Sequence, residues 1–189
     1  MKLILVRHGE TLENQKGILQ GQMQGTLSPA GKKQAQQVAQ RLKGEKIDVI
    51  YSSDLARAVE TADAIARFHP KARVHLVKEL RETDLGTLTG ASKHTVDWER
   101  LPPDVESREA LWKRASEFLR KVYDKHPSDT VVFVGHSGIN RALTAVLLNK
   151  SSKEINSIER QQNASVSIFE IKKDKNHLAL VLNSTEHLG

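Results

Sequence analysis

Short apolar segments alternate with amphipathic helical segments along this chain, and this alternation limits the possible folds more than any other feature. The apolar run 3–6 is followed by Ser28-Pro29, a typical N-cap and first helical residue. A helix starting there has one apolar face, formed by Ala35, Val38, Ala39 and Leu42. Strands that alternate with helices are typical of parallel sheets with helices on their faces. The sequence therefore predicts an α/β fold with a mostly parallel sheet.

The alternation continues to the end of the chain. Further strands are predicted at 47–51, 73–77 and 130–134, and further helices from Ser53-Asp54, over 107–123 and over 138–148. The last two apolar runs, 165–171 and 178–182, flank the polar turn KKDKNH and indicate a hairpin. The stretch 86–103 is less regular. No repeat or linker-like segment interrupts the 189 residues, so we expect a single domain over 1–189.

The chain contains no cysteine, which excludes disulfides, thiolate catalysis and cysteine-ligated metal sites. The apolar run at the N-terminus is too short for a signal peptide or a membrane span and is interpreted as a buried strand. Both observations fit a cytoplasmic protein without membrane association.

The formal net charge is +6, which is compatible with nucleic acid, an anionic membrane surface or a small anionic substrate as partner. The lysines are scattered along helices and the C-terminal segment, and few aromatic residues are present to stack on bases. These features favour an ordinary solvated surface with one anion pocket. A non-catalytic binding module for nucleic acid or an acidic protein is the alternative from another functional class.

Polar residues follow four of the predicted strands directly. These segments are Arg7-His8-Gly9-Glu10, Ser52-Ser53 with Arg57, Arg81-Glu82, and Gly135-His136-Ser137-Gly138. Because ligands bind beyond the carboxyl ends of the strands in open α/β sheets, we expect these side chains to converge at one edge.

The residue types at this edge suit phosphoryl transfer. Arginine forks match the charged oxygens of a phosphomonoester, and Arg7 and Arg57 are the natural clamp. The neutral imidazole of His8 can attack phosphorus, and His136 can donate a further hydrogen bond if it is protonated. Glu82 can give a proton to the leaving oxygen and later accept one from water.

A metal site is the competing interpretation of the same residues. His8, Glu82 and His136 resemble a ligand set of two histidines and one carboxylate. Two arginines in the same pocket would repel a cation, so we expect neither a metal nor a cofactor.

The segment LVRHGETLEN at 5–14 resembles the signature of the histidine phosphatase superfamily, in its phosphoglycerate mutase-like branch. The resemblance covers most of 3–148 in order, through LQGQMQGTLSPAGKKQAQQVAQRL, YSSDLARAVETADAIA, ELRETDLGTLTG, PPDVES and VVFVGHSGINRAL. It implies a three-layer α/β/α sandwich and a reaction that needs no metal.

The resemblance also implies roles for single residues. His8 matches the phosphorylated histidine, and Glu82 matches the proton donor. The positions that bind the phosphate are matched by Arg7, Arg57 and His136. Positions that line the same pocket and bind substrate are matched by Asn14 and by the backbone at Gln20 and Gly21.

The chain departs from the family pattern at three places. Gln22 and Gln24 stand where many members have an aromatic residue followed shortly by an acidic one. The usual Pro-Gly-Glu-Ser segment is replaced by residues 104–107, and Ser137 stands where glycine is frequent. None of these changes touches the proposed catalytic set, but they leave the substrate contacts open.

Hydrolysis is favoured over mutase activity by the length of the chain. Only 53 residues lie between Glu82 and His136, whereas mutases of the family typically carry a larger insertion there. A more open pocket admits water to the phosphohistidine. We therefore expect a phosphatase for a small phosphorylated metabolite, with phosphoglycerate mutase as the alternative. The sequence indicates neither the substrate, whose contacts are expected from 18–26 and 87–103, nor the oligomeric state.

Overall fold

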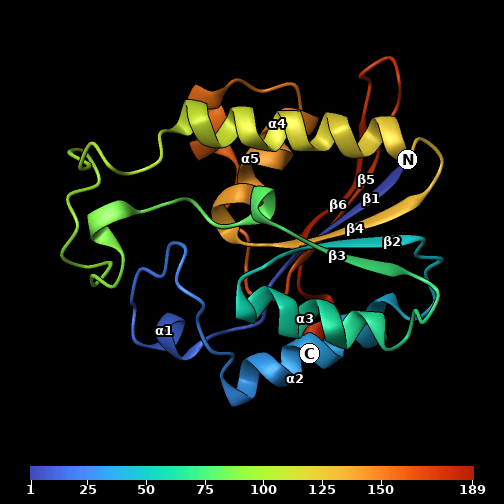
Figure 1. Cartoon of the computed structure of the whole chain (residues 1–189), viewed down its shortest axis with the longest axis horizontal. Coiled ribbons are helices and arrows are strands. Elements are labelled where there is room, and N and C mark those ends of the chain that lie inside the picture. Colours follow the sequence, from blue (N-terminus) through green and yellow to red (C-terminus); the bar gives the residue numbers. More distant parts are fainter.

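A six-stranded mixed sheet forms the centre of the molecule (Figure 1). The computed structural model describes residues 1–189, and its strand order is β3-β2-β4-β1-β5-β6. The strands are β1 (Lys2–Arg7), β2 (Val49–Ser53), β3 (Arg73–Val77), β4 (Thr130–Gly135), β5 (Val166–Glu170) and β6 (Leu178–Ser184). The first four strands in chain order are parallel, and β5 and β6 are antiparallel to their neighbours. The predicted parallel sheet with a C-terminal hairpin is confirmed.

Helices cover both faces of the sheet and give the molecule three layers (Figure 1). One face carries α2 (Pro29–Leu42) and α3 (Ala56–Ala66), and the other carries α4 (Arg108–Lys125) and α5 (Ser137–Leu147). Short helical turns complete the fold: α1 (Leu12–Gln15), η1 (Lys78–Leu80), η2 (Gly86–Leu88), η3 (Ser152–Ser157) and η4 (Glu186–Leu188). None of the helices is both long and apolar enough to traverse a bilayer.

Two helix starts follow from their capping residues. The side chain of Ser28 accepts a hydrogen bond from the Gly31 amide, and Pro29 occupies the first position of α2, as predicted. Ser107 caps α4 in the same way. The predicted start of the next helix at Ser53 was wrong, since β2 extends to Ser53 and α3 begins only at Ala56.

The register of the central strands places two functional segments side by side. β1 lies between β4 and β5, and Arg7 pairs directly with Gly135. The amide of His8 donates to the Gly135 carbonyl at 3.1 Å. The residues that follow β1 and β4 are therefore neighbours, although more than a hundred positions separate them.

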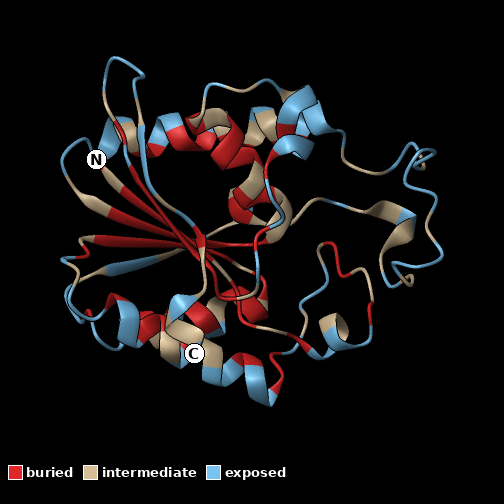
Figure 2. Ribbon diagram, turned by 180° about the vertical axis from the view of Figure 1, so that it is seen from behind, coloured by how far each residue is buried: buried red, intermediate tan, exposed pale blue.

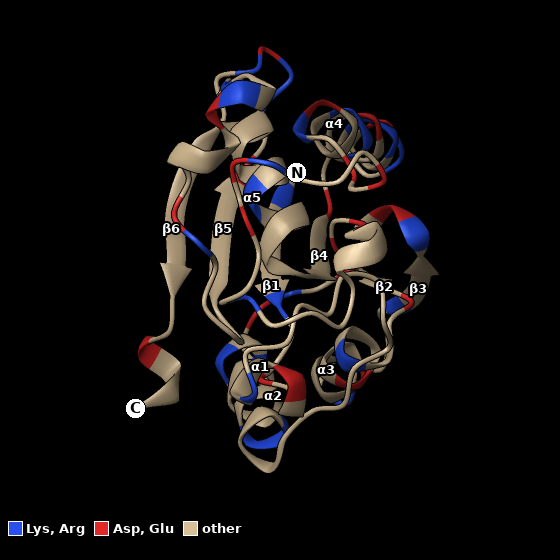
Figure 3. Ribbon diagram, turned by 90° about the vertical axis from the view of Figure 1, so that its left-hand side faces the viewer, with Lys and Arg blue, Asp and Glu red and all other residues tan.

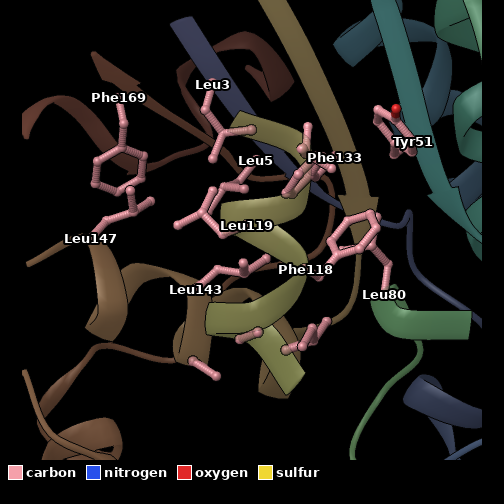
Figure 4. Packing of buried hydrophobic residues seen from close by; sticks show 14 of the residues in the cluster. Leu3, Leu5, Tyr51, Leu80, Phe118, Leu119, Phe133, Leu143, Leu147 and Phe169 are labelled. Carbon is pink, nitrogen blue, oxygen red and sulfur yellow. The ribbon is translucent and has the colours of Figure 1, made fainter. Parts of the chain in front are cut away.

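The four central strands, β2, β4, β1 and β5, are buried on both faces, as the red strands in Figure 2 show, whereas the edge strands β3 and β6 are largely exposed. On the α4 and α5 side, Leu3, Leu5, Phe133 and Phe169 pack against helix residues such as Leu143 (Figure 4). A second apolar cluster fills the space between the sheet and α2 and α3. Each fully buried side chain of this kind contributes about 1.5–3 kcal/mol. The strand ends that carry the polar residues are therefore fixed on a rigid platform.

Candidate active site

An open cleft of about 710 Å³ lies at the edge where the parallel strands end. Figure 3 looks onto this edge, with blue ribbon at the end of β1 near its centre. Seven of the eight predicted site residues line the cleft: Arg7, His8, Asn14, Gln20, Gly21, Arg57 and Glu82. The eighth, His136, is fully buried behind this surface, while the next two residues, Ser137 and Gly138, reach it.

His8 follows β1 and is held at both ring nitrogens. Its Nδ1 lies 2.7 Å from the Gly9 carbonyl oxygen, and its Nε2 accepts a hydrogen bond from Nε of Arg57 at 3.2 Å. Since a guanidinium can only donate, the ring hydrogen lies on Nδ1 and the electron pair on Nε2. Burial, followed by the charges of Arg7 and Arg57, holds the pKa of His8 well below its ordinary value. The ring is therefore a neutral imidazole, which is the nucleophilic form.

His136 follows β4 and shares the same donor. Its Nδ1 accepts from Nε of Arg57 at 3.2 Å, and its Nε2 donates to the Ser53 hydroxyl at 2.9 Å. Burial, followed by the charge of Arg57, also lowers the pKa of His136 well below the ordinary value. Without an anion nearby His136 is neutral, and the hydrogen bond that its Nε2 donates to the Ser53 hydroxyl shows that Nε2 carries the hydrogen. The sequence placed Ser53 near the site but indicated no role for it.

Arg57 lies in the first turn of α3 and is almost completely buried. Its Nη1 donates to the carbonyls of Met23 and Gln24, and its Nη2 donates to the Gly21 carbonyl at 2.9 Å. Burial lowers its pKa to about 10, so the side chain is charged at neutral pH. Because backbone carbonyls make these contacts, the loop 21–24 can hold the guanidinium whatever its side chains are. The departures at Gln22 and Gln24 therefore leave this contact intact.

Arg7, at the end of β1, retains a free donor. Its Nη1 donates to the Gln161 carbonyl at 2.6 Å, whereas its buried Nε has no hydrogen-bond partner in the protein. Burial is also the main reason why the pKa of Arg7 is lowered. A buried N–H without a protein acceptor is a ready donor for an anion in the cleft.

Asn14 is held by a residue that sequence reasoning missed. Its Oδ1 accepts from Nδ2 of Asn163 at 3.2 Å, and the same Nδ2 lies 3.3 Å from the His8 carbonyl oxygen. Asn163 thus connects the segment after β1 to the segment before β5. No local pattern in the sequence marks it, because its partners lie about 150 positions away.

Glu82 lies at the N-terminus of α5. Its Oε1 accepts from the amides of Thr83 at 2.8 Å and Gly138 at 2.9 Å. These two contacts fix the orientation of the Glu82 side chain at the start of the helix. A Cβ atom at position 138 would lie 2.3 Å from Oε1, so glycine allows the close approach.

The metal site considered as the competing interpretation has no matching group of ligands in the structure. The structure contains no group of three or more histidine, aspartate or glutamate side chains placed to hold one ion, and this includes the set His8, Glu82 and His136.

Comparison with known proteins decides the family. A sequence model described as histidine phosphatase superfamily (branch 1) matches residues 3–184. The chain belongs to the histidine phosphatase superfamily. Its relatives include phosphomonoesterases of the histidine phosphatase type.

Three similar proteins illustrate the range of the family. Phosphoserine phosphatase 1 of Hydrogenobacter thermophilus is 37% identical and aligns with 100% of this chain and 95% of its own length. Phosphoglycerate mutase-like protein 4 of Arabidopsis thaliana is 33% identical, over 99% of this chain and 86% of its own. The structure of a mycobacterial glucosyl-3-phosphoglycerate phosphatase superimposes with a TM-score of 0.89 at 27% identity, covering 97% of this chain and 99% of that one.

Proposed function

We propose that residues 1–189 act as one catalytic unit that hydrolyses a phosphomonoester through a phosphohistidine at His8, without a metal. The observation that carries this proposal is the neutral imidazole of His8, which has its electron pair on Nε2 at the base of an open cleft. In the first step Nε2 attacks phosphorus and the bond to the leaving oxygen breaks. Glu82 gives its proton to that oxygen, and the product alcohol leaves.

In the second step water attacks the phosphorus of the phosphohistidine. The P–N bond breaks and returns its electron pair to Nε2, while Glu82 takes a proton from the water. Arg7 and Arg57 stabilise the charge on the phosphoryl oxygens in both steps. The dianion also favours protonation of His136, because a nearby negative charge raises the pKa of an imidazole. Protonated at Nδ1, His136 can donate to the phosphoryl group.

The open cleft supports hydrolysis rather than mutase chemistry, because water can reach the intermediate. Interconversion of 2- and 3-phosphoglycerate by the purified protein is the assay for the alternative. Mutase turnover faster than phosphate release would contradict hydrolysis as the main reaction.

The first experiment is release of phosphate from p-nitrophenyl phosphate between pH 5 and 8, with a chelator present. We expect the wild type to be active and His8→Ala to lose at least about a thousandfold in kcat/KM, since it lacks the nucleophile. Activity that disappears on chelation, or that survives in His8→Ala, would contradict the proposed mechanism.

The wall of the cleft beside the phosphate site supports a more specific substrate class. We call Arg108, Arg141 and Arg160 the basic wall; all three line the cleft. None of the three forms an ion pair with a carboxylate. The pKa of Arg141 is lowered by burial first and then by the charge of Arg160, with a smaller effect of Arg108. Such mutual repulsion between unpaired cations is relieved by a bound anion.

The proposed substrate therefore carries a second negative group on its leaving side, in addition to the phosphate. A carboxylate fits this description, and the names of the phosphoserine and glucosyl-3-phosphoglycerate phosphatases indicate such leaving groups.

Phosphoserine and phosphoethanolamine test this substrate class, because they differ only in the carboxylate. We expect a higher kcat/KM for phosphoserine and a tenfold to hundredfold loss of that preference in Arg160→Gln, the magnitude of one charged hydrogen bond (about 1.5–3 kcal/mol). Equal rates on both esters in the wild type would contradict the second anionic group.

A further inference from the structure

The side chain of Arg114 connects α4 to the segment that carries Glu82. Its Nη1 donates to the carbonyls of Glu79 and Arg81, each at 2.8 Å, and its Nη2 lies 3.4 Å from the Glu82 carbonyl oxygen. Arg114 does not line the cleft, so it has no direct access to a substrate there.

Glu106 holds the other side of the same guanidinium. Nε and Nη2 of Arg114 donate to its two carboxylate oxygens at 3.0 and 2.7 Å, and both side chains are largely buried, at 20% and 13% exposure. Glu106 in turn accepts a hydrogen bond from the Asp84 amide at 3.1 Å and donates its own amide to the Asp84 carbonyl at 2.8 Å. The ion pair therefore holds the backbone both before and after Glu82.

This arrangement separates two tasks at Glu82. The amides of Thr83 and Gly138 orient the carboxylate, whereas the Arg114–Glu106 pair fixes the backbone from which it projects. A guanidinium is suited to the second task, because its fork can meet a carboxylate on one edge and carbonyl oxygens on the other. We infer that Arg114 is a positioning residue for the general acid Glu82, an assignment that rests on the proposed role of Glu82.

A comparison of two esters tests the assignment, with kcat/KM as the measured quantity because it reports the steps up to loss of the leaving group. Phosphoethanolamine releases an alkoxide that needs a proton, whereas nitrophenolate leaves without one. Glu82→Gln should lower kcat/KM for phosphoethanolamine about a hundredfold or more and change p-nitrophenyl phosphate far less. Arg114→Gln should show the same selectivity, with a loss on the order of 10–100-fold for the alkyl ester.

Three further measurements distinguish positioning from a general loss of structure. The inhibition constant of inorganic phosphate should stay within about twofold in Arg114→Gln, because the phosphate site is unchanged. The double variant Glu82→Gln/Arg114→Gln should be no slower than Glu82→Gln, since both act through one group. Arg114→Lys should recover part of the lost rate. Arg120→Gln, an exposed arginine on the same helix, is the matched control and should behave as wild type.

Arg114→Gln could fail to fold because it leaves Glu106 unpaired. In that case the double variant Arg114→Gln/Glu106→Gln, which removes both charges, replaces it in all of these measurements. Equal slowing of both esters by the Arg114 variant, or additive losses in the double variant, would overturn the assignment while leaving Glu82 as the acid. Equal slowing of both esters by Glu82→Gln would remove the role of Glu82 and that of Arg114 together.

Discussion

One N–H group, Nε of Arg57, is shared between His8 and His136 at 3.2 Å to each ring. The two imidazole rings lie with their centroids 5.0 Å apart, and both present an electron pair to the same donor. This sharing requires both rings to be neutral. If Nε2 of His8 or Nδ1 of His136 were protonated, its hydrogen would point at the guanidinium. Burial and the neighbouring arginines lower the pKa of both histidines, so both rings are neutral in the empty site at neutral pH.

The same lowered pKa values predict how stability depends on pH. The unfolded chain takes up protons at these histidines near pH 6.5, whereas the folded chain does so only well below that value. The contribution of each histidine to stability is therefore complete above about pH 6.5 and is lost as the pH falls toward the folded pKa. Between pH 7.5 and 5.5 each such histidine should therefore lower the free energy of unfolding, by at most on the order of 1 kcal/mol.

Urea unfolding of wild type and His8→Gln at the two pH values measures this share directly. The fall in stability should be smaller in His8→Gln by roughly the amount of one histidine, while other histidines with lowered pKa contribute equally to both proteins. An identical pH dependence of the two proteins would show that His8 takes up its proton at an ordinary pH.

Among the elements, α5 contributes most directly to the chemistry through its first turn. Its N-cap residue is His136, and its second residue, Gly138, donates its amide to Glu82. One helix start therefore positions both His136, a residue of the proposed phosphate site, and Glu82, the proposed acid. The glycine matters for its small size rather than its conformational freedom, since a Cβ there would meet Glu82 at 2.3 Å.

Gly138→Ala should displace the Glu82 carboxylate and lower kcat/KM for an alkyl phosphate on the order of 10–100-fold. Stability should change little, because the added Cβ meets the movable side-chain ends of Glu82 and Thr83 and because a helix favours alanine over glycine by about 0.5–1 kcal/mol. Gly44→Ala, where an added Cβ has no neighbour within 4 Å, is the control. Full activity of Gly138→Ala on the alkyl ester would mean that this amide does not determine where the acid lies.

The order and type of the main elements could be predicted because burial on one or both faces leaves a clear period in the sequence. The junction between β2 and α3 shows where local patterns fail. Ser53 is a good N-cap by type, but its hydroxyl accepts from His136 and its backbone ends the strand, so the helix starts at Ala56. The short turn α1 and the four η turns were also missed, since they bury no periodic face.

For the whole molecule, the predicted site residues do meet at one sheet edge, because parallel topology alone brings the strand ends together. What could not be predicted is the set of partners that hold them, such as Gln161, Asn163 and Arg114. Each of these contacts joins positions far apart in the chain, and only the packed structure determines which side chains face each other. The catalytic roles of the predicted site residues stay predictions until the variants are measured.

The position of β1 between β4 and β5 has a consequence for the chain as it is synthesised. The strand that leads to His8 is made first, yet both of its neighbours in the sheet are made in the last third of the chain. A growing polypeptide folds from its N-terminus where it can, but here β1 cannot pair with its neighbours in the sheet until β4 and β5 have been synthesised. The hydrogen bonds of Arg7 with Gln161 and of His8 with Ala164 then form at almost the same time. A growing chain that lacks β4 and β5 therefore carries His8 without the residues that surround it in the folded site, and the proposed activity requires both of these later strands.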